Sequence, residues 1–121
     1  MEVLVFANPK VLIREHVLNE ISKVPVLCPK LVLEHGRFKS LLMEKQNGRE
    51  AIVFIACDRK DMKFLASLKD YLSETRVILI LPMKKPYMVK LGLSVSPCLI
   101  TYANEDLSGV IAVLERISIH G

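Results

Sequence analysis

The sequence has few of the residues that build several common ligand sites. It has no tryptophan, and aromatic residues fill 6% of its 121 positions, which weakens any model of single-stranded nucleic acid stacking on aromatic rings. It has five glycines, and no glycine-rich loop of the kind that cradles phosphates follows any apolar segment. These absences argue against nucleic acid and nucleotides as partners, so we expect no cofactor.

Long apolar runs and cysteine pairs are also missing. No apolar run approaches the ~20 residues that span a bilayer, and Glu2 stands where an export signal would carry positive charge, so we expect neither membrane attachment nor export. Cys28, Cys57 and Cys98 are an odd number without CxxC spacing, which favours reduced thiols in a cytoplasm over disulfides or a metal site. No histidine lies at metal-ligand or triad spacing; the three are His16, His35 and His120.

The composition that remains is typical of a single globular domain over residues 1–121. Hydrophobic residues make up 51% of the chain and charged residues 25%, which excludes a disordered chain and is enough for one core. The net charge is +4. A mildly basic chain permits an acidic partner or an anion without requiring one.

Apolar segments rich in β-branched residues alternate with segments of helical periodicity along the chain. The expected strands are 2–7, 30–34, 51–57, 76–81 and 97–102. The first expected helix starts at Asn8-Pro9, the second covers 37–46 and ends before Asn47-Gly48, and the third covers 58–72. The fourth lies in the Lys-rich segment and ends at Gly92. The fifth starts at Asn104 and has Glu105 and Asp106 in its first turn.

Five consecutive strand–helix units predict an α/β fold. Parallel strands need crossover helices, and right-handed crossovers place helices on both faces of the sheet. We therefore expect a three-layer, doubly wound, flavodoxin-like domain with a five-stranded parallel sheet of order 2-1-3-4-5. Ligands of such sheets bind at the carboxyl ends of the strands, which here lead into Asn8, Asp58, Pro82 and Ala103.

Asp58 stands where the third apolar strand gives way to a helix. One hypothesis makes it a catalytic or phosphate-accepting carboxylate, and the other makes it the N-cap of that helix, with Asp61 in the first turn. We favour the cap, because the pattern offers no second carboxylate nearby. A thiol enzyme at Cys57 is a further alternative, since Arg59 and a helix N-terminus follow it and could lower a thiol pKa.

The chain resembles the receiver domain of two-component response regulators. The resemblance rests on five βα units in about 120 residues and on the opening VLVFANPKVLIREHVLNEI. It implies a fold in which two acidic residues ending the first strand hold Mg²⁺ and an Asp ending the third strand accepts phosphate. It further implies a Thr or Ser at the end of the fourth strand and a Lys at the end of the fifth.

The sequence departs from the receiver pattern at each of these positions. The acidic pair falls on Phe6 and Ala7, and the phosphoacceptor falls on Ala56 or Cys57. The Thr or Ser position falls near Leu81 or Pro82, and the Lys position falls on or near Ile100. Phosphoryl transfer from a small donor needs a divalent cation held by oxygen ligands. We therefore expect a pseudo-receiver, a non-catalytic signalling or regulatory module without the phosphorylation switch.

A second resemblance points to a thioredoxin-like domain without redox cysteines. The segment IVFIACDRKDMKFLASL, followed later by VSPCLITY, is similar to a strand, a redox helix and the proline-bearing strand of that family. The redox cysteines would fall on Arg59 and Met62. The family also has a hairpin strand after the proline-bearing strand, whereas a helix is expected here at Asn104.

Two surfaces are candidates for binding. The carboxyl ends of strands three and four lead into a cationic rim that could bind an anion or an acidic partner: Arg59, Lys60, Lys63, Lys84, Lys85 and Lys90. The resemblance to receivers implies a protein interface on the fourth helix, fifth strand and fifth helix, where this chain has Tyr87, Met88 and Tyr102. We expect the partner to be another protein or a second copy of the chain.

Overall fold

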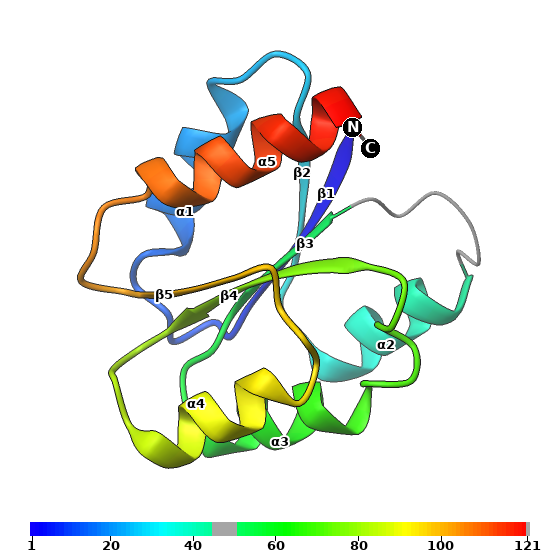
Figure 1. The fold of residues 1–121 in the computed structure, drawn as a ribbon, viewed down its shortest axis with the longest axis vertical. Helices are drawn as coiled ribbons and strands as arrows, with labels where there is room; N and C mark the ends of the chain where they lie inside the picture. The colour runs from blue at the N-terminus through cyan, green and yellow to red at the C-terminus, as the bar shows by residue number, and fades with distance from the viewer. Residues whose placement is uncertain (45–50, 121) are drawn as a thin grey trace.

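A computed structural model describes residues 1–44 and 51–120, in which strands and helices alternate (Figure 1). The strands are β1 (Glu2–Ala7), β2 (Cys28–Val32), β3 (Ala51–Ile55), β4 (Arg76–Leu81) and β5 (Leu99–Tyr102). The helices are α1 (Arg14–Ser22), α2 (His35–Glu44), α3 (Arg59–Ser67), α4 (Pro86–Leu93) and α5 (Ser108–His120).

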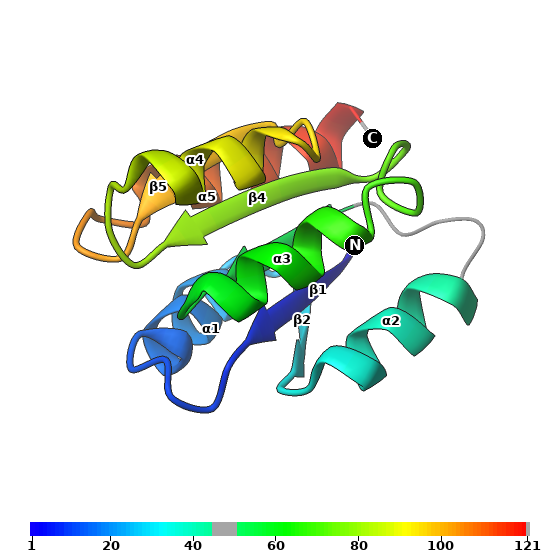
Figure 2. The same cartoon turned by 90° about the horizontal axis from the view of Figure 1, so that it is seen from below.

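The strands form one parallel sheet in the order β2-β1-β3-β4-β5, which confirms the predicted topology. Helices α1 and α5 cover one face, and α2, α3 and α4 cover the other (Figures 1 and 2). The thioredoxin-like alternative is wrong, because β5 pairs parallel to β4 and leads into α5 rather than into a hairpin strand.

The three central strands supply the middle of the core on both faces. Every residue from Val3 to Ala7 is fully buried, as are Val53 and Ile78. Because successive side chains of a strand point to opposite faces, Leu4 and Phe6 join the cluster under α2, α3 and α4, while their neighbours join the cluster under α1 and α5. Burial on both faces explains why these strands read as continuous apolar runs.

The first helix begins later than predicted. It starts at Arg14 rather than at Pro9. The Asn8 side chain accepts a hydrogen bond from the Lys10 N–H at 3.0 Å, and such a bond holds the backbone in a turn instead of a helix. Leu12, which would lie within the predicted helix, is consequently 94% exposed in the loop.

The last helix and the fourth also differ from the prediction. Helix α5 begins at Ser108, not after Asn104, because Asp106 accepts a hydrogen bond from the Ser108 N–H at 2.9 Å ahead of the helix. Gly92 does not end α4 but lies inside it, fully packed: an added Cβ there would meet Leu79 Cδ2 at 2.5 Å. The missing side chain at Gly92 thus allows α4 to pack closely against β4.

Other element boundaries shift by a few residues. Strand β2 lies two residues earlier than predicted, β3 ends at Ile55, β5 begins at Leu99, and α3 ends at Ser67 with turns after it. Helix α2 begins at His35. Its predicted end at Gln46 and the stop at Asn47-Gly48 lie outside the described residues.

Candidate functional site

The carboxyl edge of the sheet brings together the loops that follow β1, β3, β4 and β5. Strand order places the β3–α3 loop between those after β1 and β4. Ala56 extends β3 by one backbone hydrogen bond, from its N–H to the Ile80 carbonyl at 2.9 Å. The chain then leaves the sheet through half-buried Cys57 and exposed Asp58.

Asp58 is the N-cap of α3, as predicted. Its backbone is extended, and its Oδ1 accepts a hydrogen bond from the Asp61 N–H at 3.0 Å. An aspartate cap of this kind stabilises a helix by about 1 kcal/mol. The cap occupies one carboxylate oxygen of the residue considered as a phosphoacceptor; whether Asp58 accepts a phosphoryl group stays a prediction.

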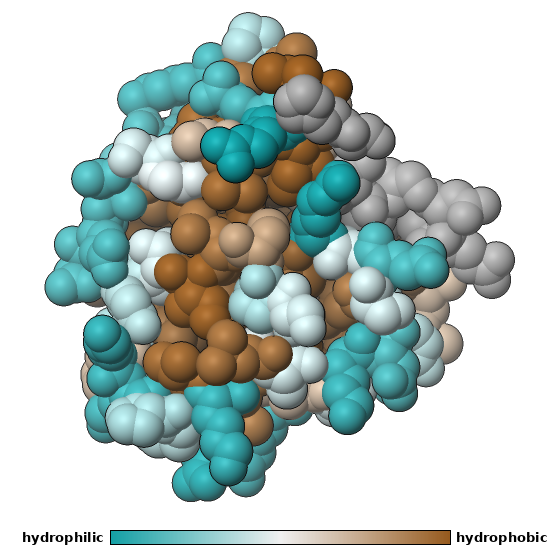
Figure 3. All heavy atoms as spheres, viewed as in Figure 1, coloured by the Kyte–Doolittle hydropathy of each residue, from teal (hydrophilic) through white to brown (hydrophobic). Residues whose placement is uncertain are grey.

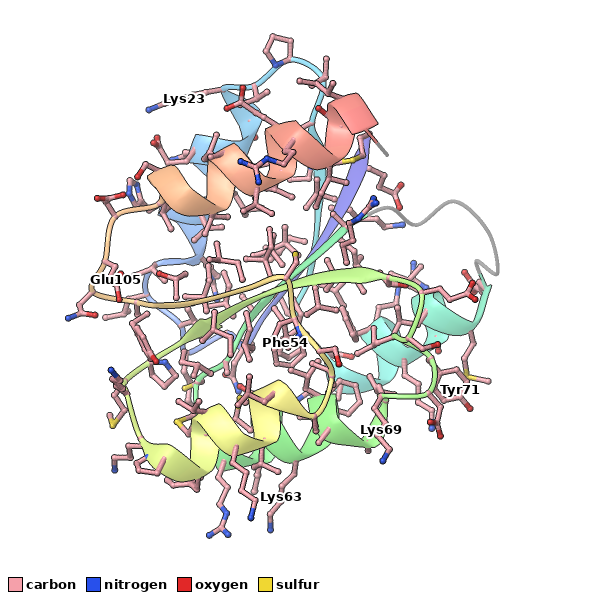
Figure 4. The ribbon with its side chains drawn as sticks, viewed as in Figure 1. Lys23, Phe54, Lys63, Lys69, Tyr71 and Glu105 are labelled. Carbon is pink, nitrogen blue, oxygen red and sulfur yellow. The ribbon has the colours of Figure 1, made fainter. Side chains whose placement is uncertain are left out.

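The positions expected to carry a receiver's acidic pair lie inside the core. Phe6 and Ala7 are both 0% exposed. The Phe6 ring stacks on Phe54 with centroids 4.6 Å apart, and Phe38 packs against both rings edge-on. All four phenylalanines of the chain belong to this cluster, with Phe64 as the fourth member. Figure 4 shows Phe54 in the interior of the molecule.

A carboxylate that we did not single out from the sequence is buried at this edge. Asp61 is 0% exposed. Its Oδ1 lies 2.7 Å from His35 Nε2, and its Oδ2 accepts a hydrogen bond from the Cys57 N–H at 2.8 Å. The Asp61 side chain therefore joins the start of α2 to the turn that leads from β3 into α3.

His35 is held from a second direction by aromatic packing. Its ring stacks on Phe64 with centroids 4.1 Å apart and planes 5° from parallel, and it also contacts Phe6. The sequence separates His35 from Asp61 by 26 residues, so spacing rules could not pair them. The sequence does hold one signal for Asp61. It lies one residue before Met62 on the inner stripe of α3, so burial of its side chain could have been predicted from the helical pattern.

The environment of Cys57 opposes a reactive thiolate. Burial raises the pKa of the Cys57 thiol, and the nearby Asp58 and Asp61 carboxylates raise it further. From the sequence we considered a thiol pKa lowered by Arg59 and the helix N-terminus. The raised pKa contradicts that alternative, because burial and, after it, the two carboxylates at the start of α3 act against the thiolate.

The predicted cationic rim spans two neighbouring helices. Helix α3 carries Arg59, Lys60 and Lys63, and the segment from Lys84 to Lys90 adds its three lysines on and before α4. All six side chains are exposed. The Arg59 guanidinium carbon lies 5.3 Å from the Tyr87 ring centroid, and this cation–π contact links the two groups. Figure 4 shows Lys63 pointing away from the body of the molecule.

Two of the three residues predicted for an interface on α4, β5 and α5 reach the surface. Tyr87 is 40% exposed, and Tyr102 is half-buried. Met88 is 2% exposed and belongs to the core, so its place in the interface is corrected: it lies on the inner face of α4. Figure 3, drawn from the side of these three elements, shows a hydrophobic area running between α5 and α4.

Two kinds of feature are absent from residues 1–44 and 51–120, the part of the chain that the structure describes. Within that part of the chain, no three His, Cys, Asp or Glu side chains come together in a group that could hold a metal ion. Nor does any helix there combine the length and apolar character of a membrane-spanning segment.

Comparisons with known proteins find likeness in structure alone. No family model matches the sequence, and no curated protein matches it. The signal receiver domain of an HD domain-containing protein from Pseudomonas fluorescens Pf-5 is similar in fold, with a TM-score of 0.78, 14% identity, and coverage of 98% of this chain and 94% of that one.

Two further solved structures give the same result. A Francisella response regulator receiver domain has a TM-score of 0.73 at 14% identity, covering 98% of this chain and 97% of that one. A LuxR family DNA-binding response regulator from Silicibacter pomeroyi has a TM-score of 0.73 at 15% identity, covering 99% and 93%. The fold is that of receiver domains; identities this low carry no residue roles.

Proposed function

We propose that this chain is a pseudo-receiver, a signalling or regulatory module that is not phosphorylated and acts by binding another protein. The receiver-domain fold supports a signalling role in general. The observation that carries the finer proposal is the burial of Phe6 and Ala7, each 0% exposed, at the positions expected for cation-holding carboxylates. A receiver needs that cation to neutralise the phosphoryl oxygens.

The two carboxylates at the start of α3 support the same proposal through their existing contacts. Asp58 Oδ1 caps the helix, and both oxygens of Asp61 are engaged, one by His35 and one by the Cys57 N–H. A phosphoryl group on either residue would have to replace bonds that hold the β3–α3 turn together.

The proposed partner surface is the face formed by α4, β5 and α5. Tyr87 and Tyr102 contribute to it, and Leu93, at 59% exposure, adds an unburied aliphatic side chain. Exposed aromatic and aliphatic residues on one face are typical of protein interfaces. The partner is another protein or a second copy of this chain.

The phosphorylation half of the proposal is tested by intact mass after incubation with Mg²⁺ and acetyl phosphate. We expect the mass to stay unchanged. Addition of one phosphoryl group to the wild-type chain, lost in Asp58→Asn, would replace this proposal with a working receiver whose site is rearranged. Asp70→Asn is the matched control, since Asp70 is an exposed carboxylate beyond the other end of α3.

The interface half is tested by sedimentation at rising protein concentration. If the partner is a second copy, the chain dimerises, and Tyr87→Glu weakens the dimer while Tyr71→Glu leaves it intact. Tyr71 is a fair control because it is 50% exposed and lies beyond the far end of α3, away from this face. A monomer at every concentration restricts the partner to another protein.

The cationic rim supports a second candidate function, an anion-binding regulatory site. The Arg59–Tyr87 contact brings the basic residues of α3 and α4 to one surface. Titration with sulfate or a nucleotide, followed by backbone amide NMR, would then shift the signals of Arg59, Lys60 and Lys85 in a saturable way. Shifts that scatter over all lysines without saturating would reject a specific anion site.

A further inference from the structure

One stretch of the sequence carries an excess of basic over acidic residues. Residues 75–104 contain four basic residues and no Asp or Glu: Arg76, Lys84, Lys85 and Lys90. The whole chain has 17 basic and 13 acidic residues, so the rest of it holds 13 of each and is neutral. The net charge of +4 therefore belongs to β4, α4, β5 and the loops around them.

An open groove runs along α4 inside this positive stretch. It is lined by Lys84, Pro86, Val89, Lys90 and Leu93 and has a volume of about 580 Å³. Three of the five lining residues are apolar, and two lysines flank them. The groove lies on the outer side of α4, since Met88 and Gly92 face inward and are buried.

From these observations we propose that the α4 groove binds an acidic amphipathic helix of a partner protein. The inference rests on the proposed function and names the chemistry of the partner. Pro86, Val89 and Leu93 lie along the eight residues of α4, and seven steps of 1.5 Å separate the first from the last by about 11 Å. A partner helix matches that length with apolar residues at positions i, i+3 or i+4, and i+7, the usual pattern of a helix lying in a groove.

The positive charge beside the groove favours an acidic partner helix over a neutral or basic one. Lys84 and Lys90 border the apolar residues, and no acidic side chain lines the groove. Glu or Asp residues on the edges of the partner helix would pair with these lysines, which raises the association rate and disfavours basic helices. The apolar residues, Leu93 above all, supply the surface removed from water.

Other anionic partners fit this surface less well. Stacking of nucleic-acid bases needs a free aromatic face, and the Arg59 guanidinium already lies over the Tyr87 ring. A lipid bilayer presents a broad plane, whereas the apolar residues here form a short strip along a single helix. The bilayer remains as an outcome of the test.

The test is a selection from a display library of random peptides long enough for about four helical turns. The target is the full chain, and binding of the enriched peptides is then measured for three variants. The groove variant carries Lys84→Glu and Lys90→Glu, and a second carries Leu93→Ser. The control carries Lys30→Glu and Lys39→Glu, an equal charge change on exposed residues of β2 and α2.

We expect the enriched peptides to be acidic, with apolar residues at helical spacing. The groove variant and Leu93→Ser should each weaken their binding at least about tenfold, and the control should stay within about twofold of wild type. All substituted residues are exposed, so far-UV circular dichroism should show folded proteins throughout.

Other outcomes overturn the inference in distinguishable ways. Neutral or basic peptides that still depend on the groove would reject the acidic partner and leave the proposed interface standing. Acidic peptides that bind the groove variant as well as wild type would reject the groove. If no peptide is enriched, the inference fails; binding to phosphatidylserine vesicles that the groove variant loses, or self-association through the groove, would then name the true occupant.

Discussion

Replacing Asp61 with alanine should lower the free energy of unfolding by about 2–4 kcal/mol. Asp61 is 0% exposed, and its two oxygens serve His35 Nε2 at 2.7 Å and the Cys57 N–H at 2.8 Å. Alanine removes both acceptor oxygens and leaves the space of the carboxylate unfilled. The change thus acts on the contact that joins α2 to the β3–α3 turn.

The magnitude follows from what each abandoned donor can do next. The Cys57 N–H is partly buried and loses its acceptor, which costs about 1–3 kcal/mol. The side chain of His35 is 38% exposed, so water can replace part of its bond and the further loss is nearer 1 kcal/mol. Relief of the desolvation of the Asp61 carboxylate offsets part of these losses and places the net cost in the lower part of the range.

Urea unfolding monitored by far-UV circular dichroism measures the effect. Asp58→Ala, which removes only the helix cap, should cost about 1 kcal/mol, and Asp70→Ala at an exposed position should cost almost nothing. A cycle of His35→Ala, Asp61→Ala and the double variant should give a coupling energy above about 0.5 kcal/mol. Additive single effects, or an Asp61→Ala cost below that of Asp58→Ala, would refute the reasoning.

Two other substitutions or modifications test the packing and the thiol. Gly92→Ala should be less stable than Gly36→Ala by about 1–2 kcal/mol in urea unfolding. The new Cβ at Gly92 would stand 2.5 Å from Leu79 Cδ2, so the buried Leu79 side chain would have to shift, whereas a Cβ at Gly36 would meet open space. Equal effects of the two substitutions would count against the packing argument. Burial and the neighbouring carboxylates raise the pKa of the Cys57 thiol, so its thiolate is scarce at neutral pH. Iodoacetamide should therefore alkylate Cys57 more slowly than exposed Cys28 at pH 7 and faster as pH rises, which peptide mapping can follow. Faster labelling of Cys57 than of Cys28 at pH 7 would contradict the pKa direction.

The strand pattern predicted the fold because local and tertiary signals agree there. Strand β4 has the predicted bounds, since its apolar run is set off by Arg76 at one end and Pro82 at the other. Prediction failed where a side chain could bond its own backbone or pack at close range. The Asn8 turn delayed α1, and Gly92 looked like a helix stop although its small size serves packing against Leu79.

The candidate site was predictable only in part. The Asp58 cap is a local signal, carried by one residue and the helix pattern after it, and it is confirmed. The His35–Asp61 pair depends on the parallel neighbours β1, β2 and β3 bringing two distant loops to one edge, which spacing along the chain does not encode. The burial of Met88 likewise depends on which side of α4 meets the sheet.

The central claim is that this receiver-like fold has no cation-dependent phosphoryl switch. Backbone amide NMR of the chain with Mg²⁺ and acetyl phosphate tests it most directly at the carboxyl edge of the sheet. We predict that the amide signals of Asn8, Cys57 and Asp58 stay where they are as Mg²⁺ and the phosphodonor are added. A saturable shift of those three signals, or a second set of resonances that Asp58→Asn abolishes, would contradict the account.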